Sequence, residues 1–192
     1  MKKKLSIFGS TGSIGETALK LTKKNQNYDF YIFTGYKNFK KIKFLIKRYK
    51  PNFFIIFDDK TYQRIKKENF KNRVKILNYK SYQSYKFKKS DVSILAIPGI
   101  AGLEPTLSAI KVSKKVLIAN KESVICGWDL ISKLVKKYKV KVLPVDSEHF
   151  SIMNLINENN KQNIEKIYLT ASGGPFLNYP LKKMKTIKPK QA

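Results

Sequence analysis

The chain is poor in cysteine, in histidine and in long apolar runs. Cys126 is its one cysteine and His149 its one histidine, so neither an internal disulfide nor a cysteine-rich metal site is possible. The longest nearly apolar run, residues 92–103, is broken by Ser93, Pro98 and glycines, and is shorter than the roughly 20 residues of a membrane helix. The apolar stretch after the N-terminal lysines is too short for a signal peptide. We therefore expect a cytoplasmic protein with no membrane partner.

Acidic residues and arginines are also scarce. The chain of 192 residues has 13 acidic against 40 basic residues, a formal charge of +27, yet only Arg48, Arg64 and Arg73 are arginines. Surfaces that read nucleic-acid sequence depend on the two-pronged contacts of arginine, whereas these lysines are scattered along the whole chain. We expect no nucleic-acid partner, although a basic nucleic-acid-binding protein stays an alternative that steep salt dependence of duplex binding would reveal.

Short apolar runs alternate with segments of helical period, which is typical of βαβ units around a parallel sheet. Strands are expected at residues 4–8, 31–34, 53–57, 74–77, 92–97, 115–119 and 140–144, and helices at 14–24, 39–49, 61–67, 104–112 and 128–138. A further helix at 150–157 and a strand at 164–170 follow. We predict an α/β protein with a Rossmann-like doubly wound sheet over residues 1–145, then the incomplete beginning of an α+β domain over 146–192.

Three glycines spaced three apart lie between the first strand and the first helix. Gly9 permits a tight turn, Gly12 lets the backbone approach a pyrophosphate, and Gly15 lets helix and strand pack closely. The spacing departs from G-x-G-x-x-G, and such loops also serve as plain turns. The end of the second strand has no acid for ribose hydroxyls, and Lys37 with Asn38 could receive a 2′-phosphate. This pattern predicts a dinucleotide site that takes NADPH in preference to NADH.

The strand at 115–119 is followed by Asn120, Lys121 and Glu122. Carboxyl ends of parallel strands form the ligand-binding edge of such a sheet, so Lys121 could hold substrate oxygens while Asn120 and Glu122 contact the nicotinamide half of the cofactor. A polar helix cap is an equally open interpretation.

The strand at 140–144 is followed by Asp146, Ser147, Glu148 and His149. An extended backbone would point Asp146 and Glu148 to one side, and oxygen ligands so placed suit Mg²⁺ or Mn²⁺. Ser147 would then have to turn toward substrate, and His149 is at most a residue that supports the ligands. A pair of surface acids that caps the following helix is the alternative.

Ser172 lies in a glycine-rich turn after the last expected strand. Its hydroxyl could donate a hydrogen bond to a phosphate group, because Gly173 and Gly174 permit close approach. A plain turn is equally consistent with these residues.

Four segments, 9–15, 119–123, 144–149 and 169–176, together resemble the 1-deoxy-D-xylulose 5-phosphate reductoisomerase family. That resemblance implies NADPH-dependent conversion of 1-deoxy-D-xylulose 5-phosphate to 2-C-methyl-D-erythritol 4-phosphate in non-mevalonate isoprenoid biosynthesis, with a divalent metal, Mn²⁺ or Mg²⁺. It implies cofactor contacts from Thr11, Gly12, Ser13, Ile14, Lys37, Asn38, Asn120 and Glu122; substrate contacts from Lys121, Ser147 and Ser172; and metal ligation by Asp146 and Glu148. Lys121, Asp146 and Glu148 would carry the catalysis.

Two departures from the family stand out. Tyr36 replaces a usual glycine before the basic residue. The resemblance also covers only about the N-terminal half of the family's length, so a third metal carboxylate, a mobile loop and a C-terminal helical domain are expected beyond Ala192. A full-length homodimer acting on a phosphorylated sugar is implied. Another NADP-dependent reductase and an inactive remnant are the alternatives.

Overall fold

The computed structural model describes residues 2–23, 25, 27–70, 74–158, 164–168 and 174–191. The chain forms two compact units, Met1–Phe150 and Ser151–Ala192. The predicted first domain ends at Val145, a few residues before the end of the first unit. Each unit is described by itself, and the site lies in the first.

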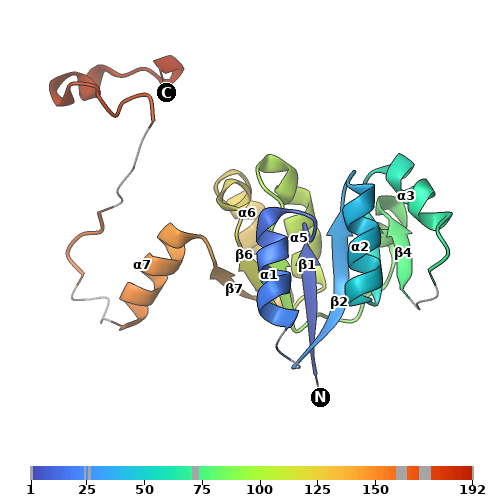
Figure 1. Ribbon diagram of the computed structural model, residues 1–192. Coiled ribbons are helices and arrows are strands. Elements are labelled where there is room, and N and C mark those ends of the chain that lie inside the picture. Colours follow the sequence, from blue (N-terminus) through green and yellow to red (C-terminus); the bar gives the residue numbers. More distant parts are fainter. Residues whose placement is uncertain are drawn as a thin grey trace. The chain divides into compact units, whose positions relative to one another are not determined.

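A parallel sheet forms the centre of the first unit (Figure 1). In the described part of the chain its strands are β1 (Lys3–Phe8), β2 (Tyr28–Gly35), β3 (Phe53–Ile56), β4 (Lys75–Asn78), β5 (Val92–Leu95), β6 (Lys115–Ile118) and β7 (Lys141–Pro144). Their order is β4-β3-β2-β1-β5-β6-β7, and every neighbouring pair is parallel. The direction of winding reverses between β1 and β5, which confirms the predicted doubly wound sheet and makes that position the expected ligand crevice.

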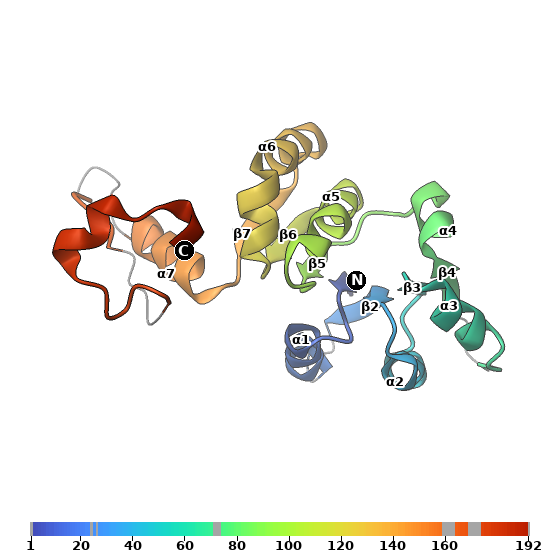
Figure 2. The same cartoon turned by 90° about the horizontal axis from the view of Figure 1, so that it is seen from above.

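Helices cover both faces of this sheet (Figure 2). On one face lie α1 (Ser13–Lys23), α2 (Phe39–Tyr49) and α3 (Asp59–Lys66); on the other lie α4 (Tyr79–Ser84), η1 (Ile100–Gly102), α5 (Leu103–Lys111) and α6 (Lys121–Tyr138). The helix α7 (Ser147–Glu158) follows β7, and η3 (Leu181–Thr186) and η4 (Pro189–Gln191) lie in the second unit. No helix in the described ranges is long and apolar enough to span a membrane.

Apolar residues three and four apart explain the covering helices. In α2 the side chains of Ile42, Leu45 and Ile46 are buried against Phe33 and Phe54 of the sheet, while its lysines face outward. The opposite face has its own apolar core, in which side chains of the sheet pack against Ala109 and Ile110 of α5 and Ile131 of α6. The sheet is thus buried between two apolar layers, and its parallel strands all end at the same edge.

Hydroxyl groups are buried inside the sheet and pair with one another. Ser6 Oγ lies 2.6 Å from Ser90 Oγ, and Ser93 Oγ lies 2.7 Å from Ser113 Oγ. The hydroxyl proton of Ser113 is donated to the carbonyl of Ala109 at 2.6 Å, so Ser93 must be the donor within its pair. The first pair connects β1 with the segment before β5, and the second connects β5 with the segment between α5 and β6.

Aromatic rings lie beside many of the basic side chains. Lys4 Nζ is 5.0 Å from the centroid of the Tyr31 ring, Lys75 Nζ is 4.4 Å from that of Tyr85, and the Arg64 guanidinium is 4.3 Å from that of Phe39. These distances fall within the range of cation–π attraction. The rings thereby act as partners for cations in a chain that has few acids.

The predicted strands of the first unit and four of its helices are confirmed within a few residues at each end. Two expectations fail, and two short helices were missed. The predicted helix 128–138 begins seven residues earlier, at Lys121, because the side chain of Asn120 caps it. The helix α4 and the short η1 were not predicted. Residues 164–168 form no strand, and the rest of the strand predicted at 164–170 lies outside the described residues.

The serine pair between β5 and β6 gives a test of the fold. We expect Ser113→Ala to lower the free energy of unfolding by about 1–3 kcal/mol, because the Ser93 hydroxyl loses its buried acceptor. Ser93→Ala should cost less, because Ser113 keeps its bond to Ala109. Urea unfolding of both single variants and the double variant measures this; additive costs would contradict the pairing.

Candidate active site

The loop between β1 and α1 is shaped by two of its three glycines. Gly9 has a φ of +89°, and a Cβ added there would lie 2.8 Å from the carbonyl oxygen of Ala96 at the end of β5. A Cβ on Gly15 would overlap the carbonyl oxygen of Gly9. At Gly12 the nearest atom to an added Cβ is the Gly9 carbonyl oxygen at 3.5 Å, an ordinary contact. Packing within the protein therefore requires Gly9 and Gly15, whereas Gly12 leaves room on the side open to a ligand.

The same loop is tied to the end of β2. Thr34 Oγ1 accepts a hydrogen bond from Gly9 N at 2.7 Å, and Ser10 Oγ donates to the Thr34 carbonyl at 2.8 Å. A cavity of about 480 Å³ opens here, lined by Gly9, Thr11, Gly12, Thr34, Gly35, Tyr36, Phe57, Ala96, Ile97, Pro98, Ala101 and Pro105. The first amides of α1 have no partners within the helix, so its N-terminus favours an anion at this loop.

The residues after β2 present a base and no acid. Asn38 caps α2, since its Oδ1 accepts a hydrogen bond from Lys41 N at 3.1 Å. Lys37 is exposed, and its Nζ lies 4.9 Å from the centroid of the Tyr36 ring. The sequence prediction of a basic receiver for a 2′-phosphate is therefore compatible with the positions of both side chains.

Asp58, at the end of β3, is an acid that sequence reasoning missed. It caps α3 by accepting a hydrogen bond from Thr61 N at 2.8 Å. Hydrogen bonds from Thr61 hold the pKa of its carboxyl below the usual range, and the charges of Lys37 and Lys60 add to this effect. The signal in the sequence was a pair of aspartates after a buried strand.

Asn120, at the end of β6, uses both its side-chain oxygen and its side-chain nitrogen in hydrogen bonds within the protein. Its Oδ1 accepts a hydrogen bond from Ser123 N at 2.9 Å, and its side-chain amide donates to the carbonyls of Ile97 and Gly99. The residue is 2% exposed. The helix-cap interpretation thus describes its contacts, and its predicted contact with the nicotinamide stays a prediction.

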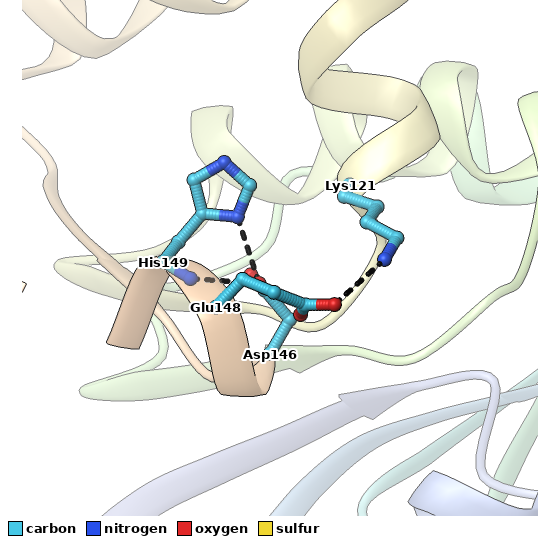
Figure 3. A network of polar contacts seen from close by, with 4 residues as sticks. All are labelled: Lys121, Asp146, Glu148 and His149. Atoms are coloured by element: carbon cyan, nitrogen blue, oxygen red, sulfur yellow. Dashed lines mark hydrogen bonds and ion pairs between the residues drawn. The ribbon is translucent and has the colours of Figure 1, made fainter. Parts of the chain in front are cut away.

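Two acids lie at the start of α7, Asp146 directly before the helix and Glu148 in its first turn (Figure 3). Asp146 Oδ1 accepts hydrogen bonds from His149 N at 3.0 Å and lies 2.7 Å from His149 Nδ1. Glu148 Oε1 lies 3.3 Å from Lys121 Nζ. The expected extended backbone through Ser147 and Glu148 is wrong, because capping by Asp146 starts the helix at Ser147. The acids are therefore brought to one place by a helical turn.

Asp146 remains ionised despite its partial burial. Burial by itself raises the pKa of this carboxyl, but the hydrogen bonds from the backbone and ring of His149 outweigh it and hold the pKa below the usual range. A carboxylate in this form is ready to accept a cation.

A second cavity, of about 420 Å³, unites the polar segments. It is lined by Ile14, Ala96, Ile97, Pro98, Ala119, Asn120, Lys121, Glu122, Val145, Asp146, Ser147 and Glu148. Of the other predicted site residues, Thr11 and Gly12 line the first cavity, Ser13 begins α1, and Lys37 and Asn38 follow β2. Ser172 lies outside the described residues.

Residues 96–98, which line both cavities, were missed from the sequence. They follow β5, the strand beside β1 at the reversal of winding. The position of β5 in the sheet, which the sequence alone does not reveal, would have been the signal.

The donor set beside Lys121 suits a hard divalent cation, but it is incomplete. Asp146 and Glu148 supply carboxylate oxygens on one wall of the cavity, the ligand type that Mg²⁺ and Mn²⁺ prefer. No group of three potential ligands among His, Cys, Asp and Glu occurs in the described part of the chain. Lys121 supplies the positive charge next to Glu148 in this structure.

A doubly wound parallel sheet with a glycine loop at the reversal of winding defines a protein of the Rossmann-like class, in which such a loop typically binds a dinucleotide. Comparison with protein families then identifies the particular group. Residues 5–127 match the family described as 1-deoxy-D-xylulose 5-phosphate reductoisomerase, and residues 142–192 match the C-terminal domain described under the same name. The chain belongs to this family.

Known relatives agree with this assignment. The chain is 47% identical to the reductoisomerase of Pelagibacter ubique over 99% of its own length and 50% of the relative's, and 37% identical to that of Clostridium novyi over 99% and 51%. The solved Zymomonas mobilis enzyme in complex with NADPH has a TM-score of 0.83 and 32% identity, covering 100% of this chain and 51% of that one. A DOX-P reductoisomerase in complex with NADPH, fosmidomycin and magnesium has a TM-score of 0.73 and 31% identity, covering 99% and 50%. The chain spans about half the length of the relatives it matches.

Because Gly12 and Gly15 have different surroundings, we expect an alanine at one position to affect binding and at the other to affect stability. We expect Gly15→Ala to lower the free energy of unfolding by about 2 kcal/mol or more, because its methyl group meets the backbone of the loop. Gly12→Ala should cost less than about 1 kcal/mol but weaken dinucleotide binding at least tenfold. Thermal unfolding and NADPH titration of the two variants check this; equal stability of both would contradict the packing role of Gly15.

Proposed function

We propose that the chain forms the cofactor domain and the start of the catalytic region of a cytoplasmic 1-deoxy-D-xylulose 5-phosphate reductoisomerase. The observation that carries this proposal is the cavity in which Ile14 of the glycine loop, the polar residues after β6 and the acids after β7 meet. Because the relatives are about twice as long, the complete reaction belongs to a longer protein in this proposal. That reaction rearranges 1-deoxy-D-xylulose 5-phosphate and reduces the product to 2-C-methyl-D-erythritol 4-phosphate.

The glycine loop and the ends of β2 and β6 hold the dinucleotide in this proposal. Thr11, Gly12, Ser13 and Ile14 contact its pyrophosphate and ribose, Lys37 and Asn38 receive the 2′-phosphate, and Asn120 and Glu122 border the nicotinamide. NADPH supplies the hydride when it is bound. The buried hydrogen bonds of Asn120 support this role indirectly, because they fix the backbone that carries Lys121 and Glu122.

Asp146 and Glu148 hold the metal, and Lys121 with Ser147 and Ser172 holds the substrate. A Mg²⁺ or Mn²⁺ ion held by these two carboxylates would supply Lewis-acid polarisation of the substrate carbonyl. Lys121 places a positive charge beside the substrate oxygens, where negative charge develops. His149 orients Asp146 through its two hydrogen bonds, so the carboxylate keeps a fixed direction toward the cavity.

The partners in this proposal are a small phosphorylated sugar and a second copy of the full-length protein. Both rest on membership of the family. Nucleic acid has no part in the proposal.

The first test is NADPH binding to the 192-residue chain, followed by fluorescence titration. We expect saturable binding at least tenfold tighter than that of NADH, because a 2′-phosphate gains a charged hydrogen bond from Lys37. Folded protein that binds neither nucleotide would contradict the proposal. Steep salt-dependent duplex binding in its place would favour the nucleic-acid alternative.

The metal assignment is tested with Asp146→Asn. Asparagine caps a helix about as well as aspartate, so this variant removes the charge but keeps the start of α7. We expect Mn²⁺ binding, measured by titration calorimetry, to weaken at least tenfold while NADPH affinity stays unchanged. The matched control is Asp129→Asn, an exposed acid on α6. Equal Mn²⁺ affinity of the two variants would remove Asp146 from the metal site.

A further inference from the structure

Tyr36 lies at the rim of the cavity beside the glycine loop, and its neighbour Lys37 contacts the Tyr36 ring. Tyr36 lines the cavity of about 480 Å³ and is 56% exposed. Its ring centroid lies 4.9 Å from Lys37 Nζ. The ring is therefore not a core residue, and its contact with the ammonium group needs an explanation other than packing.

The backbone of this pair is fixed on both sides. The carbonyl of Gly35 accepts a hydrogen bond from Phe57 N at 3.0 Å, and the carbonyl of Lys37 accepts one from Phe39 N at 2.8 Å and one from Thr61 Oγ1 at 3.4 Å. Any freedom of Lys37 consequently lies in its side chain, which is long and rich in rotamers.

Two features act on the Lys37 ammonium group from this fixed backbone. The charge of Asp58 attracts it, although the pKa of the Asp58 carboxyl is lowered mainly by the Thr61 hydrogen bonds and only to a smaller extent by Lys37. The Tyr36 ring attracts it toward the rim of the cavity that the glycine loop lines. A lysine held by Asp58 alone would be partly neutralised for a phosphate, whereas a neutral ring positions the ammonium without cancelling its charge.

From this arrangement we propose that Tyr36 determines cofactor specificity, by holding the Lys37 ammonium group ready for the 2′-phosphate of NADPH. The inference rests on the proposed function, since it requires the cavity to take the dinucleotide. A lysine that is positioned in advance loses less rotamer freedom on binding, so the affinity for the phosphorylated cofactor rises. The affinity for NADH, which has no 2′-phosphate, does not depend on the pair.

The test is a double-mutant cycle on the ratio of dissociation constants for NADH and NADPH. We expect Tyr36→Leu to lower this ratio about two- to fivefold, the range of an exposed cation–π contact, and Lys37→Met to lower it about tenfold or more. Tyr36→Phe keeps the ring and should keep the ratio. In the Lys37→Met background, Tyr36→Leu should change the ratio no further.

Lys137→Met is the matched control, because it removes a lysine that lies 5.8 Å from the centroid of the Tyr138 ring, at the end of α6. It should leave both affinities unchanged. If Tyr36→Leu weakened the binding of NADPH and NADH equally, the ring would stack on the adenine, and the inference would be overturned. The inference would also be overturned if Tyr36→Leu changed neither affinity. Loss of all nucleotide binding by the unmodified chain would instead refute the proposed function.

Discussion

The site depends on one close contact, between the glycine turn at the end of β1 and the Ala96 carbonyl at the end of β5. A Cβ at Gly9 would lie 2.8 Å from that carbonyl, so only a glycine lets the two strand ends approach this closely. Residues 96–98 consequently line both cavities, one on the side of the glycine loop and one on the side of the acids. The reversal of winding creates the crevice, and the missing side chain at Gly9 sets its width.

Helix caps supply most of the polar geometry at this edge of the sheet. Asn38, Asp58, Asn120 and Asp146 each accept a hydrogen bond from the first turn of the helix that follows a strand. Capping fixes these side chains, and thereby the neighbours Lys37, Lys121 and Glu148 that remain exposed at the edge. An asparagine or aspartate at each of these positions thus starts the helix and also holds the neighbouring site residues in place. A structural and a functional interpretation of the same residue therefore need not exclude each other.

Much of the fold followed from periodicity, because buried parallel strands and amphipathic helices have distinct patterns. The start of α6 did not. Gly127 departs from helical geometry, with φ of −126° and ψ of 20°, and only the part beyond it has a clear apolar stripe. The glycine loop and the acids after β7 were predicted as site residues from their place after strands. What could not be predicted was the order of β5 in the sheet, the capping bonds, and therefore the helical turn that carries Glu148, since these depend on contacts between residues distant in sequence.

The rings beside the basic side chains have a consequence for the response of the protein to acid. Carboxylates lose their charge as the pH falls below about 4, and in this chain they are few. The contact between a cation and the face of an aromatic ring involves no proton that titrates in acid. Tyr31, Tyr85 and Phe39 therefore keep attracting their cations at a pH at which protonated carboxyl groups no longer form ion pairs. A protein with so large an excess of lysine thereby retains part of its surface order where its own acids no longer contribute.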